Sequence, residues 1–226
     1  MGYKIAIDGP AGAGKSTIAK LIAKKLGFIY VDTGAMYRAM ALFMMNEGVD
    51  AKDTEAINRK CKEADITIRY ENGEQIVLLN GENVNGLIRT QQVGNMASLT
   101  SPNIEVRKKL VELQQRLAAS ADVVMDGRDI GTCVLPDAEV KVFLTAGSRV
   151  RAERRYKELL EKGESCDLDV IEKEIIKRDE QDMTREVSPL VAAEDATLVD
   201  SSYMTIEEVA ETIIGMTSCD KIHGQE

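Results

Sequence analysis

The feature that most constrains this chain is a short apolar strand followed by a glycine-rich loop. Residues Ile5–Asp8 read IAID, and Gly9–Thr17 (GPAGAGKST) fit the pattern G-x-x-x-x-G-K-[ST] at every position. In that pattern backbone N–H groups surround phosphate oxygens, the lysine reaches the β- and γ-phosphates, and the hydroxyl residue holds Mg²⁺. A glycine-rich turn without a ligand is the alternative, but a helical pattern follows at Ile18–Ala23, which is the context that a phosphate loop requires.

The loop predicts a nucleotide-phosphate site and a magnesium site. Lys15 is the expected catalytic cation, and Ser16 is the expected Mg²⁺ ligand. A second buried strand ends in Asp126, which is expected to orient Mg²⁺ through a water molecule. That signal is weak by itself, because many strands end in aspartate. The residues expected to contact the phosphates are Gly9, Pro10, Ala11, Gly12, Ala13, Gly14, Lys15, Ser16 and Thr17.

The composition argues against several classes of protein. The formal net charge is −9, whereas nucleic-acid-binding proteins usually present a basic surface. The cysteines Cys61, Cys133, Cys166 and Cys219 form no C-x-x-C pair, so free thiols in a reducing compartment are expected. We find no signal peptide and no apolar run of membrane-spanning length, which predicts a cytoplasmic location. The one histidine, His223, lies in a polar tail, so a triad built on a positioned imidazole is nearly excluded.

The order of the elements predicts an α/β fold. Five apolar strand patterns alternate with helical patterns, as in a five-stranded parallel sheet flanked by helices. The strands are expected at Ile5–Asp8, Phe28–Val31, Asp122–Asp126, Val140–Leu144 and Thr197–Asp200. The helices are expected at Ile18–Ala23, Met36–Met45, Asp53–Ala64, Thr90–Leu99, Asn103–Ala119, Ser148–Tyr156, Asp167–Asp182 and Ile206–Met216. The length suits one domain over residues 1–226.

Residues 63–86 break this alternation. Ile66–Tyr70 and Gln75–Leu79 are rich in β-forming residues and flank one Asn-Gly turn, and a second Asn-Gly pair follows at Asn80. This pattern predicts an antiparallel hairpin or a small three-stranded sheet. We interpret it as an insert, because antiparallel strands do not easily belong to a parallel core.

Arginines concentrate in one predicted helix. The stretch Arg149–Arg155 carries four of them in seven residues of an otherwise acidic chain. A solvated helix face is the usual meaning of such a run. Here the run follows a strand end, where nucleotide phosphates are expected, so a phosphate-clamping lid over residues 148–185 is favoured.

The phosphate loop does not by itself identify the reaction. The chain lacks the Asn-Lys-x-Asp stretch that reads guanine in small GTPases, and it is too short for the paired domains of a helicase. A small kinase that passes the terminal phosphoryl group of a nucleoside triphosphate to a small acceptor remains.

Several further motifs stand in one order along nearly the whole chain. They are Gly9–Thr17, Asp32–Arg38, Ile88–Thr90, Asp126–Thr132, Arg149–Arg155 and, at intervals, residues between Arg178 and Leu190. Together they resemble the bacterial cytidylate kinases, a branch of the nucleoside monophosphate kinases. The resemblance implies a P-loop kinase core with the β insert near the acceptor and an arginine-rich lid. It also implies a monomer that uses MgATP to convert CMP and dCMP to their diphosphates.

The resemblance implies a role for individual residues on the acceptor side. Arg38, Arg128 and Arg185 would grip the acceptor phosphate through bidentate hydrogen bonds, with Arg128 also catalytic. A structural ion pair is the alternative for each of them. The residues that would read cytosine are Asp129, Arg107, Ser98 and Thr33. A carboxylate suits the exocyclic amine of cytosine and not the oxygen of uracil.

Two further assignments are less fully determined. Arg178 and Asp182 lie one helical turn apart and would reach the sugar hydroxyls, although a surface ion pair is the alternative. Arg151 and Arg155 are expected to contact ATP, with Arg155 also catalytic. The spacing alone does not determine which lid arginines reach the phosphates.

Two other functions stay open at this point. One is a kinase for another acceptor, such as UMP, AMP or shikimate, which predicts no penalty for replacing cytosine. The other is a nucleotide-dependent switch protein, which predicts slow hydrolysis without an acceptor. The arginines expected around a second anion argue against the switch.

Overall fold

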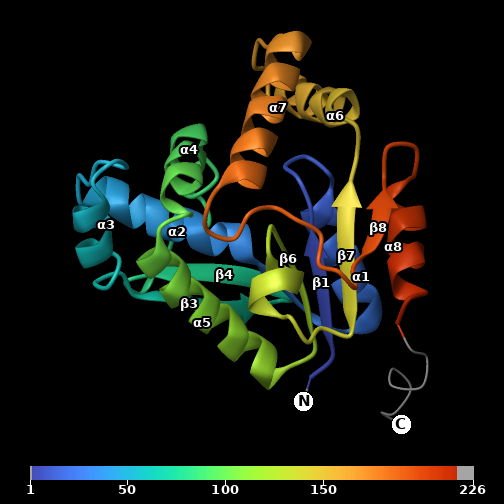
Figure 1. Ribbon diagram of the computed structural model, residues 1–226, viewed down its shortest axis with the longest axis horizontal. Helices are drawn as coiled ribbons and strands as arrows, with labels where there is room; N and C mark the ends of the chain where they lie inside the picture. The colour runs from blue at the N-terminus through green and yellow to red at the C-terminus, as the bar shows by residue number, and fades with distance from the viewer. Residues whose placement is uncertain (1, 218–226) are drawn as a thin grey trace. The chain divides into compact units, whose positions relative to one another are not determined.

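The computed structural model describes residues 2–217 and contains the predicted α/β core (Figure 1). Within these residues the larger sheet has five strands in the order β2-β6-β1-β7-β8, and the smaller sheet has the order β3-β4-β5. The predicted five-stranded parallel sheet and the small antiparallel sheet are therefore confirmed. Cys219 and His223 lie outside the described residues.

The chain divides into two compact units. Of the described residues, unit 1 contains residue 2 and residues 29–121, and unit 2 contains residues 3–28 and 122–217. The elements of unit 1 are β2 (Ile29–Asp32), α2 (Thr33–Asn46), α3 (Thr54–Lys60), β3 (Ile66–Glu71), β4 (Glu74–Leu79), β5 (Glu82–Asn83), α4 (Gln91–Thr100) and α5 (Ile104–Ser120). Those of unit 2 are β1 (Lys4–Asp8), α1 (Lys15–Leu26), β6 (Val123–Gly127), the π-helix η1 (Ile130–Val134), β7 (Val140–Thr145), α6 (Ser148–Glu161), α7 (Leu168–Thr184), β8 (Thr197–Asp200) and α8 (Ile206–Ile214).

The core of unit 2 is built on β1, which lies between β6 and β7. Both pairs are parallel, and Asp8 at the end of β1 is level with Gly127 and Phe143. Ile5 and Ile7 have no exposed surface, because neighbouring strands and covering elements bury both faces of a parallel sheet. Helix α1 contacts β1, β6 and α8. The loops that leave the ends of β1 and β6 therefore emerge at the same edge of the sheet.

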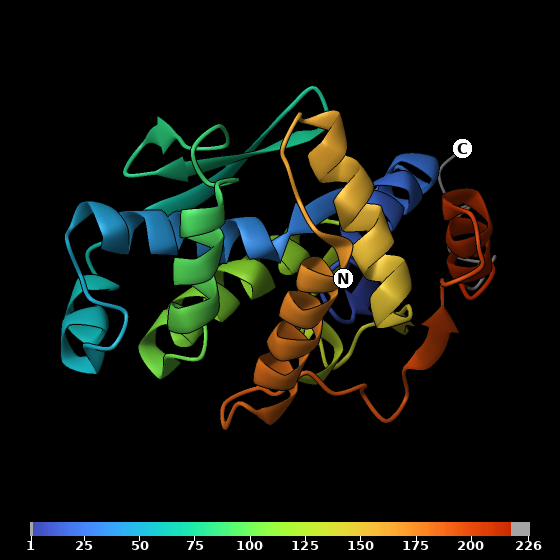
Figure 2. The ribbon, with the colours of Figure 1, turned by 90° about the horizontal axis from the view of Figure 1, so that it is seen from above.

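Helices α6 and α7 of unit 2 contact each other and make up most of the predicted lid region (Figure 2). Both run further than the sequence predicted, since α6 continues to Glu161 and α7 to Thr184. Helix α7 begins after Asp167, whose carboxylate accepts from the N–H groups of Asp169 and Val170. This aspartate is an N-cap, which explains why the helix starts there.

Unit 1 is organised around α2, which contacts α4, α5, β3 and β4. Of the two predicted forms of the insert, a hairpin or a three-stranded sheet, the structure contains the three-stranded sheet, with β4 between β3 and β5. Asn72 and Gly73 join β3 to β4, and Asn80 and Gly81 join β4 to β5, all four with positive φ angles. These pairs are the Asn-Gly turns that favour tight antiparallel hairpins.

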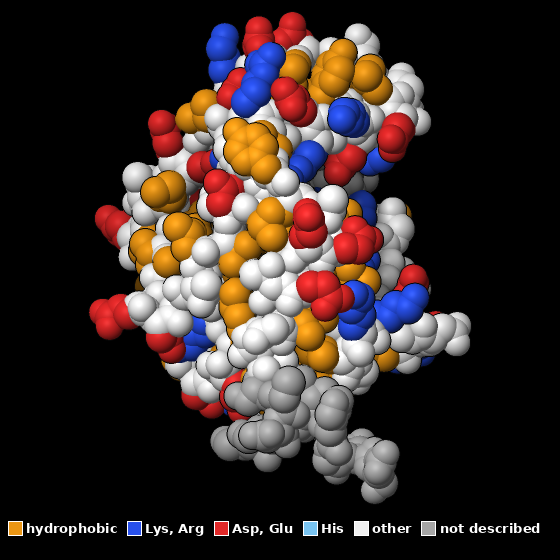
Figure 3. Space-filling view, turned by 90° about the vertical axis from the view of Figure 1, so that its right-hand side faces the viewer, with side chains coloured by type: hydrophobic (Ala, Val, Ile, Leu, Met, Phe, Trp, Pro, Cys, Tyr) orange, Lys and Arg blue, Asp and Glu red, His pale blue; other side chains and the backbone are white. Residues whose placement is uncertain are grey.

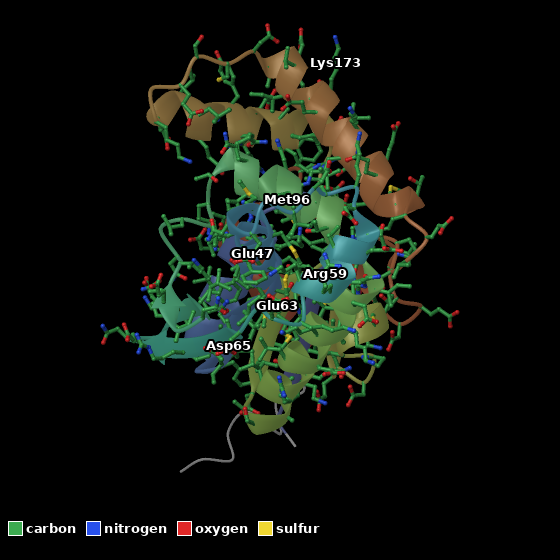
Figure 4. All side chains as sticks on the ribbon, turned by 90° about the vertical axis from the view of Figure 1, so that its left-hand side faces the viewer. Glu47, Arg59, Glu63, Asp65, Met96 and Lys173 are labelled. Atoms are coloured by element: carbon green, nitrogen blue, oxygen red, sulfur yellow. The ribbon has the colours of Figure 1, made fainter. Side chains whose placement is uncertain are left out.

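The boundaries of two unit 1 helices differ from the sequence prediction. Helix α2 starts at Thr33, three residues earlier than predicted, because the carboxylate of Asp32 accepts from the N–H of Ala35 at 2.9 Å. The helix predicted over Asp53–Ala64 ends at Lys60, where the chain turns toward β3. The ammonium of Lys60 donates to the carboxylates of Glu47 and Glu63, which are labelled in Figure 4.

A helix that the sequence did not predict connects β6 to the chain before β7. The π-helix η1 begins directly after Asp129. Short π-helical turns are frequent at functional sites. No helix within residues 2–217 is both long and apolar enough to cross a membrane.

Candidate active site

The phosphate loop of unit 2 depends on glycine at two close contacts. A Cβ atom on Gly9 would lie 1.9 Å from the carbonyl oxygen of Leu144 in β7, and Gly9 has a φ of +146°. A Cβ atom on Gly12 would lie 3.3 Å from Cβ of Arg151, and its φ is +77°. Both positions therefore exclude larger residues, which keeps the loop backbone in the open curve that phosphate binding requires.

Lys15 and Ser16 occupy the start of α1. Lys15 is buried, and its ammonium donates to the carbonyl oxygen of Pro10 at 2.8 Å. Burial and the nearby charge of Arg128 lower the pKa of Lys15. A phosphate anion at the loop would favour the charged ammonium and oppose this effect.

Ser16 and Asp126 form an oxygen pair suited to Mg²⁺. The hydroxyl of Ser16 donates to Oδ2 of Asp126 at 2.9 Å, and Asp126 is buried at the end of β6. Residues 2–217 hold no cluster of three or more His, Cys, Asp or Glu side chains suited to a metal. Mg²⁺ is normally bound by one or two protein oxygens, water and substrate phosphates, so the hydroxyl and carboxylate oxygens fit this ion.

Two arginines of α6 bind the backbone of the phosphate loop. Arg151 is 5% exposed and donates to the carbonyl oxygens of Ala146, at 2.8 Å, and Ala11, at 3.0 Å. Arg154 donates to the carbonyl oxygen of Ala13 at 3.5 Å and to that of Ser201 at 2.7 Å. The loop and the lid helix are thus in contact through guanidinium groups.

The other two arginines of the cluster make contacts outside the loop. Arg155 forms an ion pair with Glu158 at 3.1 Å within α6. Arg149 pairs with Asp169 at 2.6 Å and with Glu172 at 3.0 Å, both on α7. Charged side chains of both signs are interspersed over the α6 and α7 region in Figure 3. The sequence predicted that Arg151 and Arg155 contact ATP, and this stays a prediction. The arginines that hydrogen-bond to the loop backbone are Arg151 and Arg154.

Helix α7 brings a carboxylate to two of the predicted acceptor-phosphate arginines. Nε of Arg128 donates to Oδ2 of Asp182 at 2.8 Å, and Nη1 of Arg185 lies 3.9 Å from Oδ1 of the same carboxylate. Asp182 is 8% exposed. A buried carboxylate between two guanidiniums balances their charge and holds them near each other. On the same helix Asp179 pairs with Arg151 of α6 at 2.6 Å, so α7 carries carboxylates for an arginine of the α6 cluster and for Arg128 and Arg185.

Asp8 holds the turn that carries Arg128 and Asp129. Its Oδ1 accepts from the N–H of Ile130 at 2.8 Å, and its Oδ2 accepts from the N–H of Gly131 at 2.7 Å. Burial raises the pKa of Asp8 to about 6, although the two N–H bonds act in the opposite direction. Nothing in the sequence pattern of the phosphate loop distinguished Asp8 as part of a site.

In unit 1, Arg38 on α2 lies against the start of α4. Its Nη1 donates to the carbonyl oxygens of Ile88, at 3.1 Å, and Thr90, at 3.4 Å. A Cβ atom on Gly94 would lie only 3.0 Å from that nitrogen. Glycine at this position in α4 therefore allows the guanidinium to lie close to the helix.

The three other predicted unit 1 site residues lie on α2, α4 and α5. Thr33 is buried at the start of α2, and Ser98 on α4 is half-buried. Arg107 on α5 is 5% exposed and donates to the hydroxyl of Tyr37 on α2 at 3.3 Å. Burying a charged guanidinium is costly unless its N–H groups are hydrogen-bonded. Arg107 is therefore expected to keep these hydrogen bonds, which hold its side chain in place.

The β insert is tied to the residue before Thr33. The side-chain amide of Gln75 accepts from the N–H of Asp32 at 2.8 Å and donates to its carbonyl oxygen at 3.2 Å. The hydroxyl of Tyr70 donates to the carbonyl oxygen of Tyr30 at 3.1 Å. Arg89 pairs with Asp32 at 2.5 Å. The sequence pattern indicated no role for Tyr70 or Gln75, because side-chain bonds to the backbone of another strand leave no regular spacing.

The predicted site residues divide between the two units. Unit 1 contains Thr33, Arg38, Ser98 and Arg107. Unit 2 contains the phosphate loop, Asp126, Arg128, Asp129, Arg151, Arg155, Arg178, Asp182 and Arg185. Arg178 is half-buried on α7, four residues before Asp182.

Comparison with known proteins adds independent evidence. The sequence model of the family described as cytidylate kinase matches residues 5–218. A cytidylate kinase from Caldicellulosiruptor saccharolyticus is 54% identical over 93% of this chain and 93% of its own length. Cytidylate kinases from Shouchella clausii and Carboxydothermus hydrogenoformans are 49% and 50% identical, over 95% and 93% of this chain and 96% and 95% of their own lengths. The chain belongs to the cytidylate kinase family.

Proposed function

We propose that the chain transfers the γ-phosphoryl group of ATP to CMP and dCMP, forming CDP or dCDP and ADP. The observation that carries this proposal is the pair of arginines, Arg128 and Arg185, on either side of Asp182, in the unit that also contains the phosphate loop. A phosphate loop accounts for one anion, and the arginine pair suits a second. The family membership supports cytidine nucleotides as the acceptors.

On the ATP side, the loop amides and Lys15 bind the β- and γ-phosphates. Arg151 and Arg155 contact the transferred group from the lid, as the family resemblance implies, and the bond from Arg154 to the loop supports adding this residue. These cations stabilise the charge that spreads over the oxygens of the phosphoryl group during transfer. Ser16, and Asp126 through water, would hold Mg²⁺, which supplies further charge neutralisation when bound.

On the acceptor side, Arg38, Arg128 and Arg185 bind the phosphate of CMP. Three guanidiniums offset the charge of a dianion and orient one of its oxygens toward the γ-phosphorus. Before the acceptor binds, the carboxylate of Asp182 balances two of these charges. No general base is needed, because a phosphate dianion is already a competent nucleophile.

Base and sugar selection come from the remaining predicted residues. Asp129 accepts from the amine of cytosine, and Arg107, Ser98 and Thr33 bind other polar atoms of the base. Uracil presents an oxygen where cytosine presents the amine, which would leave two acceptors facing each other. Arg178 and Asp182 bind the sugar hydroxyls.

We further propose that residues 148–185 act as a lid and that the enzyme is a cytoplasmic monomer. Contacts of Arg151 and Arg154 with the loop backbone support the lid role. The free cysteines Cys61, Cys133 and Cys166 suit a reducing compartment. Closure of such a lid excludes water and limits wasteful hydrolysis of ATP.

The proposal is tested by following both products. Incubation with MgATP and CMP should yield ADP and CDP in equal amounts, measured by ion-exchange chromatography. Lys15→Ala should form neither product at a comparable rate while still binding CMP in a calorimetric titration. ADP formation without CDP from the unmodified chain would contradict phosphoryl transfer to CMP.

A further inference from the structure

A buried carboxylate outside the predicted site residues holds the turn that carries two of them. Asp8 is the last residue of β1 and directly precedes Gly9, the first residue of the phosphate loop. It is 4% exposed, and its two oxygens accept from the consecutive N–H groups of Ile130 and Gly131 at 2.8 and 2.7 Å. A carboxylate that spans two successive amides fixes the direction of that backbone.

These two N–H groups are the first of the π-helix η1 and need an acceptor. The first N–H groups of any helix lack partners within the helix, and usually the side chain of the N-cap residue accepts from one of them. Asp129 occupies the N-cap position, and aspartate is among the best residues for capping. Yet its side chain makes no capping bond, and its backbone has φ −151° and ψ 30°.

Asp8 therefore performs the capping that Asp129 would otherwise perform. Because Asp8 binds the N–H groups of Ile130 and Gly131, the carboxylate of Asp129 is not used for capping. Asp129 is 5% exposed, so its orientation is fixed by its surroundings. Arg128, the residue before Asp129, donates to Asp182. The side chains of Arg128 and Asp129 are thus both held in defined directions.

Gly131, one of the two donors, lies directly beside the carboxylate of Asp8. A Cβ atom on Gly131 would lie 3.4 Å from Oδ2 of Asp8 and 3.3 Å from Cδ of Lys141. An added methyl group would contact the carboxylate, and the flexible side chain of Lys141 would have to shift slightly. The contact can thus be disturbed from either partner, through the acceptor Asp8 or through the donor Gly131.

We propose that Asp8 is a positioning residue for acceptor selection: it caps η1 from the end of β1 and so directs the carboxylate of Asp129 toward the base and Arg128 toward the acceptor phosphate. This inference rests on the proposed function, in which Asp129 reads cytosine. Asp8 touches neither substrate in this account. It acts through the backbone that follows Asp129.

The test compares three variants with the unmodified chain. Asp8→Asn retains the shape but replaces one acceptor oxygen by an NH₂ group, which cannot accept from an N–H. Gly131→Ala leaves Asp8 intact and adds a methyl group in contact with its Oδ2, which makes it the milder change. Asp122→Asn is the matched control, since Asp122 also accepts from a backbone N–H of the chain at β1, that of Tyr3 at 2.6 Å, but precedes β6. Thermal melting and circular dichroism establish that each variant is folded.

The informative quantity is the ratio of kcat/KM for CMP to kcat/KM for UMP. Asp8→Asn should raise KM for CMP and lower this ratio by roughly tenfold, as expected for the loss of one good base contact. Gly131→Ala should change both quantities in the same direction but to a smaller extent. The dissociation constant of ATP should change less than KM for CMP, because the hydrogen bonds of Asp8 go to Ile130 and Gly131 and not to the phosphate loop. Asp122→Asn should leave the ratio unchanged.

The outcomes separate the inference from the proposed function. If the unmodified chain does not prefer CMP to UMP, the proposed function fails before any variant is tested. If it prefers CMP and both variants keep the full ratio, the positioning role of Asp8 is wrong. Equal weakening of ATP and CMP binding would instead assign Asp8 to the support of the phosphate loop and would overturn the inference. If Asp8→Asn does not fold, the ratio measured for Gly131→Ala decides.

Discussion

The guanidinium of Arg128 donates through Nε to the carboxylate of Asp182 at 2.8 Å, within unit 2 of the protein. The carboxylate lies between Arg128 and Arg185, two arginines that the proposed function assigns to the acceptor phosphate. The negative charge of Asp182 therefore lies beside the arginines that are proposed to bind the negatively charged acceptor phosphate. Asp182 has two consequences for binding: it orients the arginines, and it partly neutralises them.

Removing the charge of Asp182 should weaken the binding of CMP. Asp182→Asn retains the size of the side chain but loses the charge-assisted bond to Arg128, which is worth about 1.5–3 kcal/mol. We expect KM for CMP to rise by roughly 10- to 100-fold, since 1.4 kcal/mol corresponds to about tenfold. The dissociation constant of ATP should stay nearly constant. An unchanged KM for CMP would show that Asp182 does not contribute to acceptor binding.

The second prediction concerns Gly94. Alanine at this position would bring a Cβ atom to 3.0 Å from Nη1 of Arg38, and the guanidinium would have to move. Alanine also favours a helix by about 1 kcal/mol relative to glycine. Gly94→Ala should therefore raise the midpoint of thermal unfolding while raising KM for CMP several-fold, by roughly 1 kcal/mol of binding free energy, a typical loss for one displaced hydrogen-bonding group.

Opposite changes in stability and in acceptor binding would distinguish displacement of Arg38 from general damage. Asn95→Ala, at the next and exposed position of α4, is the control and should leave KM for CMP unchanged. If Gly94→Ala improves stability with no effect on KM, Arg38 does not need its present position to bind the acceptor.

The third prediction addresses the β insert. Gln75 makes two hydrogen bonds to the backbone of Asp32, the residue before Thr33. Gln75→Ala removes both and should lower the free energy of unfolding by about 1–3 kcal/mol, since each bond contributes about 0.5–1.5 kcal/mol. It should also raise KM for CMP, because Thr33 then begins α2 in a less defined position. Gln92→Ala, an exposed glutamine on α4, is the control for loss of a glutamine side chain.

Urea unfolding and initial-rate kinetics on the same preparations test this prediction. A loss of stability without a change in KM would mean that the insert stabilises unit 1 but has no part in acceptor binding. A change in KM without a loss of stability would mean that the insert contributes to acceptor binding and does not stabilise unit 1.

The fourth prediction is a pH dependence that arises from Asp8. Burial and the charge of Asp129 raise the pKa of Asp8 to about 6 from 3.8, while the bonds from Gly131 and Ile130 and the charge of Lys15 lower it. In the unfolded chain its pKa returns to the ordinary value. The folded state therefore binds the proton more tightly, and this contribution to stability is complete below pH 3.8 and lost as the pH rises through about 6.

The comparison is between the unmodified chain and Asp8→Asn, which cannot titrate. As the pH falls from 7.5 to 5, the free energy of unfolding of the unmodified chain should rise by roughly 1 kcal/mol relative to that of the variant. One pKa unit corresponds to about 1.36 kcal/mol. Urea unfolding at several pH values measures the difference. A difference that is constant over this range would mean that the pKa of Asp8 is not raised.

Local patterns predicted most of the fold. The phosphate loop, the buried strands and the Asn-Gly turns are short, contiguous signals, and each appeared where the sequence indicated. The boundaries of α2 and α3 were less accurate, because capping by Asp32 and the turn after Lys60 depend on single side chains. The π-helix η1 was not predicted at all, since its cap, Asp8, lies 122 residues from Ile130.

The same distinction applies to the candidate site. The phosphate-loop motif predicted Lys15 and Ser16, and a strand end predicted Asp126. In the structure a hydrogen bond joins Ser16 to Asp126. The contacts of Arg154 and Gln75 come from the three-dimensional arrangement of distant segments, which residue spacing does not encode. Spacing does not distinguish the arginines of α6, because all four lie within two turns of one helix, and their different contacts are visible only in the structure.

We propose that this member of the cytidylate kinase family phosphorylates cytidine monophosphates in preference to other acceptors. The most direct test is the rate of ADP release from MgATP with CMP, dCMP, UMP, AMP or GMP, and with no acceptor. Fast turnover confined to CMP and dCMP is the predicted result. ADP release at the same rate with every acceptor, or without any, would contradict the claim.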